Sequence, residues 1–154
     1  KVMADIVDQA TRSRMMARIK GINTRPEIAL RRALHALGLR FRLHAKQLPG
    51  RPDIVLPRWK AVIFVHGCFW HRHVGCRYTT QPATRSDFWD KKFAANIKRD
   101  KANIQYLADA GWRVLIVWEC ELKERGAESV ASDALLWLSS GYEIGSKSNA
   151  ARIL

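Results

Sequence analysis

The sequence predicts a single α/β domain with a mixed central β-sheet flanked by helices. Two apolar segments of strand length, residues 61–65 and 114–118, are typical of strands that are buried on both faces of a sheet. Segments with the three-four apolar spacing of helices alternate with the strands, which gives the order α-β-β-β-α-β-α. A chain of 154 residues suits one core, and no repeat or linker divides it. We therefore expect a basic arm over residues 1–22, one domain over 23–140 and a tail over 141–154.

The first helix is predicted to begin at Thr24-Arg-Pro-Glu27, which is typical of a capping box. The Thr24 hydroxyl can accept a hydrogen bond from an unpaired backbone amide of the first turn, and the Glu27 side chain can reach back to the cap residue. The helix should end near Leu37, because Gly38 follows it. Three leucines then share its apolar face: Leu30, Leu34 and Leu37.

The remaining elements follow from alternation, apolar runs and turn residues. In chain order they are strands over residues 39–43, 54–56 and 61–65, a loop over 67–83, a helix over 86–110, a strand over 112–118 and a helix over 128–138. The turn over residues 48–53 delivers Asp53 to the start of the second strand, and Gly111 stops the long helix.

A formal net charge of +13 indicates a polyanionic partner. Each phosphate neutralised by lysine or arginine releases condensed counterions, so we expect nucleic acid rather than a merely solvated basic surface. A membrane partner is disfavoured, because residues 11–20 fit a basic amphipathic helix only weakly. No apolar run approaches the roughly 20 residues that cross a bilayer, and the N-terminal residues lack a signal-peptide core. We expect a cytoplasmic monomer.

Cys68-x4-His73-x2-Cys76 places three metal-binding side chains in one loop, and Cys120 follows a strand expected to lie nearby. Three thiolates and one imidazole are the usual tetrahedral set for structural zinc. An odd number of cysteines argues against a disulfide framework, and unrelated buried cysteines are the plainer alternative. His71 could replace His73 as the fourth ligand, and the spacing does not decide between them.

Four polar side chains occupy strand ends or helix faces that should be apolar. Glu27 and Asp100 interrupt apolar helix faces, while Asp53 and His66 lie at the ends of two strands expected to be neighbours. Singly, each has an ordinary explanation, such as a helix cap, an ion pair or a core histidine. Together, in so basic a chain, they predict a pocket that binds a divalent metal and transfers protons, as phosphodiester hydrolysis requires.

Two aromatic pairs, Phe69-Trp70 and Phe88-Trp89, lie in the loop and at the start of the long helix. Aromatic pairs usually belong to a core. Their positions here also suit stacking on bases or wedging between them.

The assembled residues resemble the bacterial very-short-patch-repair (Vsr) DNA mismatch endonucleases. The resemblance covers about residues 5–125. The matching segments are ATRS (10–13), LPGRPD (48–53), VIFxHGCFWH (62–71), PATR (82–85), FW (88–89) and GWRVLIVWEC (111–120). The resemblance implies a type II restriction-endonuclease-like fold with a structural zinc, so that residues 23–140 form the endonuclease domain.

The resemblance also implies roles for single residues. Asp53 and the backbone carbonyl of Val65 would bind catalytic Mg²⁺, and His71 would be the general base, which leaves His73 as the zinc ligand. The zinc set is then Cys68, His73, Cys76 and Cys120. The supporting active-site residues are His66, Glu27 and Asp100. The implied DNA contacts are Met16 as a minor-groove wedge, Phe69, Trp70 and Trp89 as intercalating aromatics, and Lys92 and Asn96 near the mismatched pair.

The implied activity is a Mg²⁺-dependent nick 5′ to the thymine of a T/G mismatch left by deamination of 5-methylcytosine. The substrate would be double-stranded DNA of the bacterial nucleoid, with mismatch-repair proteins as candidate partners. Two alternatives are a restriction or homing nuclease and an inactive zinc-stabilised DNA-binding module. Aromatic residues that wedge between bases favour a mismatched site, which argues against the restriction or homing nuclease. The intact set of Asp53, His66, His71 and Asp100 argues against the inactive module.

Two positions depart from the family pattern. Val65 stands where better-known members carry threonine, which is harmless if only the backbone carbonyl binds metal. The zinc loop has one extra residue around Val74-Gly75.

Overall fold

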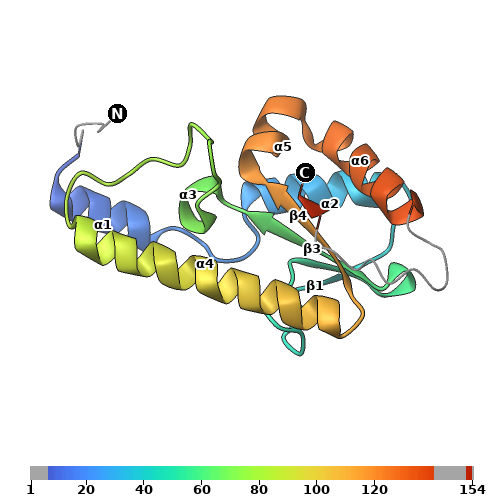
Figure 1. The fold of residues 1–154 in the computed structure, drawn as a ribbon. Helices are drawn as coiled ribbons and strands as arrows, with labels where there is room; N and C mark the ends of the chain where they lie inside the picture. The colour runs from blue at the N-terminus through green and yellow to red at the C-terminus, as the bar shows by residue number, and fades with distance from the viewer. Residues whose placement is uncertain (1–6, 141–151, 154) are drawn as a thin grey trace.

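The computed structural model describes residues 7–140 and 152–153, and it places one five-stranded sheet between helices (Figure 1). The strands are β1 (Arg42–Leu43), β2 (Ile54–Leu56), β3 (Ala61–His66), β4 (Arg113–Trp118) and β5 (Arg152–Ile153), in that order across the sheet. The first three pair antiparallel, whereas β4 is parallel to both β3 and β5. This is the mixed sheet that the sequence predicts.

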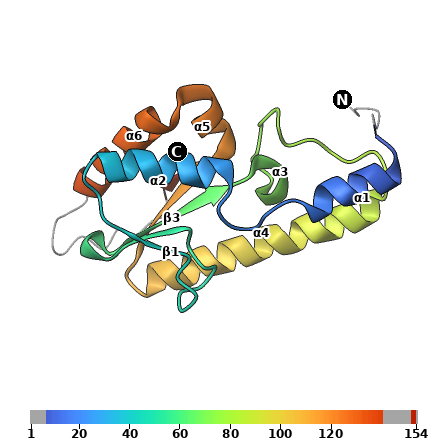
Figure 2. The same ribbon diagram turned by 180° about the vertical axis from the view of Figure 1, so that it is seen from behind.

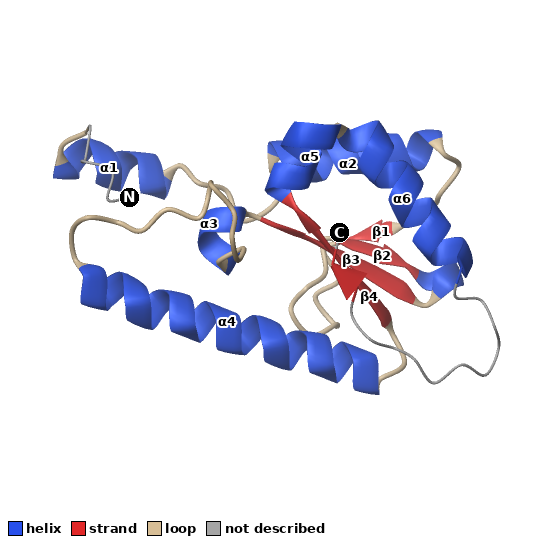
Figure 3. Cartoon of the chain, turned by 45° about the horizontal axis from the view of Figure 1, so that its top comes forward, coloured by secondary structure: helices blue, strands red, loops and turns tan. Residues whose placement is uncertain are grey.

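Helices cover both faces of this sheet (Figures 1 and 2). They are α1 (Gln9–Ala17), α2 (Arg25–Ala36), α3 (Cys68–His71), α4 (Ser86–Asp109), α5 (Glu119–Arg125) and α6 (Ala127–Ser140), with a 3-10 turn η1 (Pro57–Trp59) between β2 and β3. Helices α2, α5 and α6 lie on one face, and the long helix α4 lies on the other. Helix α1 lies beside the first turns of α4 (Figure 3). Within the described ranges, no helix combines the length and the apolar character that a membrane span needs.

Alternation along β3 divides the core between the two faces. Ala61 and Ile63 are fully buried against α2 and α6, whereas Val62 and Phe64 pack toward α4. Because side chains alternate along a strand, His66 at the end of β3 shares the α4 side with Phe64. The same alternation in β2 puts Asp53, two residues before Val55, on that side. The sheet thus brings an aspartate and a histidine to one edge.

The end of α2 differs from the predicted apolar stripe. Leu30 and Leu34 are fully buried, but Leu37 is 41% exposed. Gly38 has φ +85° and donates to the His35 carbonyl, while the Leu39 amide donates to the Leu34 carbonyl. This glycine-dependent helix stop turns the chain so that Leu39 is buried in place of Leu37.

The strand predicted over residues 39–43 is shorter than expected, since only Arg42 and Leu43 pair with β2. Leu39 still completes the end of α2, and β2 itself has three residues, so there is little edge to pair with. His44 then adopts φ +46°, which ends the strand.

Three short helices were not predicted. α1 lies within the basic arm, α3 forms inside the predicted loop over residues 67–83, and α5 follows β4 directly. Helical spacing is hard to recognise in segments of four to nine residues, and α1 buries no side chain at all. The predicted tail contributes edge strand β5, and residues 1–6, 141–151 and 154 lie outside the described residues. The division into arm, domain and tail stays a prediction.

Candidate active site and metal cluster

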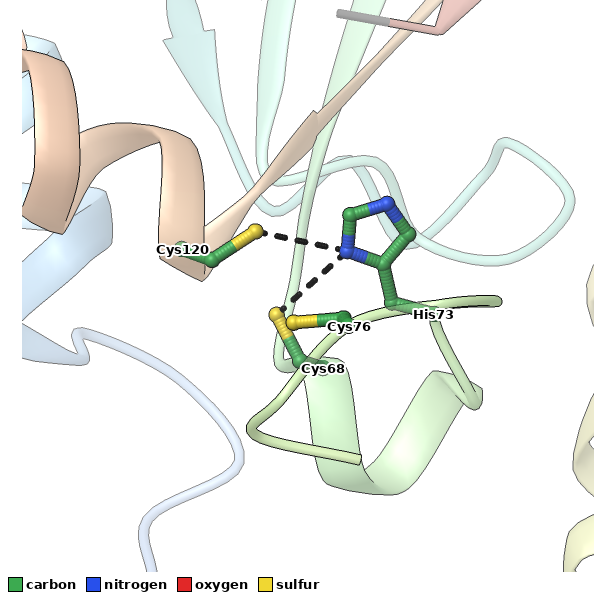
Figure 4. Close-up of side chains that lie close together, drawn as sticks. All are labelled: Cys68, His73, Cys76 and Cys120. Carbon is green, nitrogen blue, oxygen red and sulfur yellow. Dashed lines mark hydrogen bonds between the residues drawn. The ribbon is translucent and has the colours of Figure 1, made fainter. Parts of the chain in front are cut away.

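The four predicted zinc ligands converge on one point beside α3 (Figure 4). His73 Nδ1 lies 3.3 Å from Cys120 Sγ and 3.8 Å from Cys68 Sγ, and one ligand atom of each residue, Cys76 included, lies within 4.8 Å of the others. Sulfur and imidazole donors at these spacings suit a tetrahedral Zn–S and Zn–N shell of roughly 2.0–2.3 Å radius. The donor set therefore fits zinc.

Burial, followed by contacts with Cys68 and Cys76, raises the pKa of the Cys120 thiol to about 12. A thiol so crowded by other thiols needs a cation to become a thiolate. Burial also raises the pKa of Cys68, whereas for Cys76 the effect of burial is outweighed by hydrogen bonds, which leave its pKa lowered. A bound cation would favour the thiolate form of all three.

Neighbouring groups fix the cluster before any ion is considered. The His73 ring stacks on Trp118 at 4.1 Å and 4° between planes. The Thr79 hydroxyl lies 2.8 Å from the His73 carbonyl and 3.1 Å from the Cys68 carbonyl, both of which can accept its hydrogen. Cys68 and Cys120 are buried. With four protein donors and this packing, the cluster leaves no open position for a substrate, as expected of a structural site.

Arg72 separates the two histidines that spacing could not tell apart. It adopts φ +55°, a left-handed conformation that is uncommon outside glycine. Its guanidinium lies 4.0 Å over the Phe93 ring and donates to the Thr80 carbonyl at 3.0 Å. The reversal at Arg72 sends His73 into the cysteine cluster and leaves His71 on the opposite side.

The predicted catalytic residues line a single cavity of about 1140 Å³. They come from four elements and the turn before a fifth: Glu27 from α2, Asp53 from the residue before β2, His66 from the end of β3, His71 from α3 and Asp100 from the middle of α4. Val65 also lines it. Basic side chains share the cavity wall: Lys20, Lys46, Arg51 and Arg99. An acidic and imidazole floor with basic walls suits a phosphodiester and its counterion.

Asp53 is held by the backbone rather than by a cationic side chain. Its Oδ2 accepts a 2.7 Å hydrogen bond from the Val65 amide. Burial outweighs this bond and raises the pKa of the Asp53 carboxyl to about 7. The Val65 side chain packs against the core cluster on the α2 side. A hydroxyl at this position would thus not be needed to hold Asp53, whose contact is with the amide.

His71 and Asp100 form the closest polar pair in the cavity. His71 Nδ1 lies 2.6 Å from Asp100 Oδ2, and the His71 ring stacks on His66 at 3.8 Å and 7°. Burial alone would raise the pKa of Asp100, but the hydrogen bond and charge of His71 leave it lowered. Burial, with His71 adding to it, lowers the pKa of His66 to about 3. His66 is therefore neutral at physiological pH.

Glu27 is 3% exposed, as its place on the apolar face predicts, but it does not form the expected capping box. The Thr24 hydroxyl accepts no amide; it donates to Glu27 Oε1 at 2.9 Å, and Glu27 Oε2 accepts from the Asn23 amide at 3.0 Å. Arg31 donates to the same oxygen at 2.8 Å. A carboxylate so buried takes the nearest donors, including the positive charge one turn along α2.

His44 is a cavity residue that the sequence reasoning did not single out. One of its ring nitrogens, a Glu27 oxygen and an Asp53 oxygen lie within 4.8 Å of one another. Arg31, which contacts His44, was missed as well. The i, i+4 spacing of Glu27 and Arg31 was the available signal for that pair, but nothing local marks His44, which lies 17 residues after Glu27 in the sequence.

The predicted DNA-contacting residues gather around the start of α4. Phe69, Trp70 and Trp89 contact one another with ring centroids 5.1–6.0 Å apart, and the Lys92 ammonium lies 5.5 Å from Trp70. Asn96 donates to the Trp70 carbonyl at 3.2 Å.

Met16 on α1 lines a second cavity of about 490 Å³. The cavity wall also includes Arg12, Phe88, Trp89 and Lys92. The arm and the aromatic cluster thus form one basic and aromatic surface, as a base-stacking surface would require.

Comparisons with known proteins agree with these features. A profile of the family described as DNA mismatch endonuclease Vsr matches residues 4–77. Type II nicking enzyme V.XorIIP of Xanthomonas oryzae pv. oryzae is 50% identical over 125 residues, which cover 81% of this chain and 91% of that protein. DNA mismatch endonuclease Vsr of Escherichia coli is 48% identical over 133 residues, covering 86% and 83%. Type II nicking enzyme V.NmeAIP of Neisseria meningitidis is 42% identical over 123 residues, covering 80% and 87%.

Proposed function

This chain belongs to the Vsr family of DNA mismatch endonucleases, and from that premise we propose that it nicks duplex DNA 5′ to the thymine of a T/G mismatch. Family membership makes it a DNA-nicking hydrolase. The observation that supports the proposed site best is the 2.6 Å contact between His71 and Asp100 in the cavity that Asp53 also lines. The bacterial relatives favour the nucleoid as the place of action.

His71 acts as the general base in this proposal. Asp100 is an ionised acceptor, so His71 Nδ1 carries the hydrogen between them and Nε2 keeps its lone pair. Nε2 takes a proton from the attacking water, and Asp100 stabilises the resulting imidazolium. The neutral His66 ring, stacked at 3.8 Å, holds the plane of His71 without adding a competing charge.

Asp53 and the Val65 backbone carbonyl are the proposed Mg²⁺ ligands. When bound, Mg²⁺ neutralises charge that develops on the scissile phosphate. A buried carboxyl with pKa near 7 fits this role, because a divalent cation is the partner that would keep it ionised. Cys68, His73, Cys76 and Cys120 hold zinc, which orders the loop that carries His71.

DNA recognition is assigned to the aromatic surface. Phe69, Trp70 and Trp89 enter beside the mismatched pair from the major groove, and Met16 enters from the minor groove. Lys92 lies beside the Trp70 ring, Asn96 donates to the Trp70 carbonyl, and both would contact the neighbouring pair. A mispaired step costs less to unstack than a matched one, which favours insertion at the mismatch.

Single-turnover nicking of a T/G duplex and its C/G counterpart tests the proposal. We expect the wild type to nick the T/G duplex roughly ten- to hundredfold faster, since one mismatched pair is worth a few kcal/mol of discrimination. Asp53→Asn should lower that rate on the order of 10³-fold, because it removes the charge that holds the metal.

Asp109→Asn is a matched control, because Asp109 is exposed at the end of α4 and bonds only to Gln105 among the described contacts. It should nick like the wild type. Equal rates on both duplexes would point to a restriction or homing nuclease instead, and undiminished nicking by Asp53→Asn would remove the site.

A further inference from the structure

His44 occupies a well-fixed position at the edge of the cavity. Its φ of +46° lies in the left-handed region, which few residues other than glycine adopt, although histidine does so more often than most. Its backbone amide donates to the Asp53 carbonyl at 3.4 Å. The main chain therefore ties the imidazole to the residue that precedes β2, and the ring lines the same cavity as Asp53.

Arg31 determines which nitrogen of His44 carries hydrogen. Arg31 Nη2 lies 2.8 Å from Glu27 Oε2 and 2.9 Å from His44 Nε2, and its two hydrogens can serve both contacts. Arg31 Nη1 donates to Asn23 Oδ1 at 2.8 Å. His44 Nε2 also lies 3.3 Å from Asn23 Oδ1, which can only accept, but the 2.9 Å contact with Arg31 is the shorter one. Because a guanidinium only donates, Nε2 accepts from Arg31 and Nδ1 carries the hydrogen of the neutral ring.

The same contacts argue against a second metal at this group. Although Glu27, His44 and Asp53 lie close enough to share an ion, the Arg31 guanidinium already occupies the space between Glu27 and His44. The Glu27 oxygens also accept from Asn23 and Thr24. A positive charge in that place takes the role that a cation would have.

We propose that His44 donates a hydrogen bond from Nδ1 to a phosphate oxygen of the DNA strand that Asp53 receives, with Arg31 as the residue that fixes its tautomer. In the part of the chain that the structure describes, no hydrogen bond is found at Nδ1. One ring nitrogen of His44 lies within 4.8 Å of an Asp53 oxygen, and the ring lines the same cavity as Asp53. Nδ1 belongs to the same small ring, so a phosphate bound beside Asp53 would be near it. The inference rests on the proposed function, because it deepens the substrate contacts of that site.

The test combines His44 variants with single methylphosphonates, which delete the charge of one phosphate. Binding to the T/G duplex is measured by fluorescence anisotropy in Ca²⁺, with a methylphosphonate at each of the three phosphates centred on the nick. His44→Gly removes the ring while suiting positive φ, and it should weaken binding about tenfold or more, the effect of one hydrogen bond to a charged group. At one of the three phosphates, the methylphosphonate should weaken DNA binding by the wild type to a similar extent. At that same phosphate it should not weaken binding by His44→Gly any further.

Three other variants separate a phosphate contact from a structural effect. His44→Gln keeps an N–H donor and should recover part of the loss. Arg31→Lys should bind more tightly than Arg31→Met, because it keeps a donor for Nε2. His35→Gln, which changes an exposed histidine on α2, should match the wild type.

The proposal would be overturned if the losses of affinity caused by His44→Gly and by the methylphosphonate were additive at all three phosphates. It would also be overturned if His44→Gln bound the duplex no more tightly than His44→Gly. A rise in the Mg²⁺ concentration needed for half-maximal nicking by His44→Gly would instead identify a metal ligand and also overturn it. If His44→Gly fails to fold, the comparison of His44→Gln with the wild type across the three phosphates decides by the same criterion of additivity. Loss of T/G preference in the wild type would contradict the proposed function alone, since the phosphate scan can be read on any duplex that binds.

Discussion

The cysteine cluster and the acidic cavity share one loop, yet they are built in opposite ways. In the cluster, three sulfurs and a nitrogen crowd within 4.8 Å, and Trp118 stacks on the histidine. In the cavity, carboxylates and imidazoles line about 1140 Å³ of space. Soft donors closed around one point suit a structural ion, while hard donors around an open space suit a substrate.

What joins the two regions is the short segment from α3 to His73. Cys68 and His73 face the cluster, and His71 between them faces Asp100. A loop of this length would be mobile by itself, so an ordered cluster on one side fixes the base on the other. The cysteine cluster therefore keeps the loop rigid, and the acidic cavity carries the groups that react with the substrate.

The largest expected effect comes from His71→Ala, which would separate chemistry from rigidity. Single-turnover nicking should fall by roughly 10²–10⁴-fold, the usual contribution of a general base. Zinc content should stay at the wild-type value, because His73 and not His71 lies in the cluster. His35→Ala is the control for loss of a histidine. If His71→Ala purified without zinc, the two regions could not be treated as separate.

Cys120→Ser addresses the other region, with a smaller effect on nicking. The variant should lose most of its zinc, which the wild type should carry at about one ion per chain, and should unfold at a lower temperature. Nicking should fall about ten- to a hundredfold, as expected when the support of a catalytic group is loosened.

Thr79→Val gives a milder comparison for the cluster, because it removes a hydroxyl that binds two loop carbonyls but removes no ligand. It should retain zinc. Full activity in zinc-free Cys120→Ser would show that the cluster does not position His71.

The sequence anticipated much of both regions. Continuous apolar runs placed β3 and β4 correctly, and the polar interruptions at Glu27 and Asp100 marked side chains that do line the cavity. The spacing of Cys68, His73 and Cys76 located the cluster, which the structure brings together with Cys120. These signals were readable because period and residue type are local properties of the chain.

Features that depend on long-range packing were out of reach. His44 joins the cavity because a left-handed turn places it beside Glu27, and Arg31 became part of that network through the fold. Leu37 was expected in the core, but the glycine stop after α2 buries Leu39 instead. Periodicity predicts which side chains share a face within one helix or strand. The conformation of the turn that follows decides which residue fills the buried position at the end of that element.

The smallest expected effect is a pH dependence of Mg²⁺ binding in the cavity. The folded pKa of Asp53 is raised from 3.8 to about 7, so the protein holds this proton until the pH approaches 7. A proton and Mg²⁺ compete for the same carboxylate. The Mg²⁺ concentration that gives half of the maximal increase in melting temperature should therefore rise about tenfold for each pH unit below 7 and level off above pH 7. His66, with a pKa lowered to about 3, should add no proton in that range.

Thermal melts across Mg²⁺ titrations between pH 5.5 and 8.5 measure this dependence. Asp53→Asn should lose the Mg²⁺ stabilisation at every pH, because asparagine lacks the carboxylate, and it should still bind zinc, because the four zinc donors lie in the cluster. A slope that persisted in Asp53→Asn would place the competing proton on another group and weaken the assignment of Asp53 as the metal ligand.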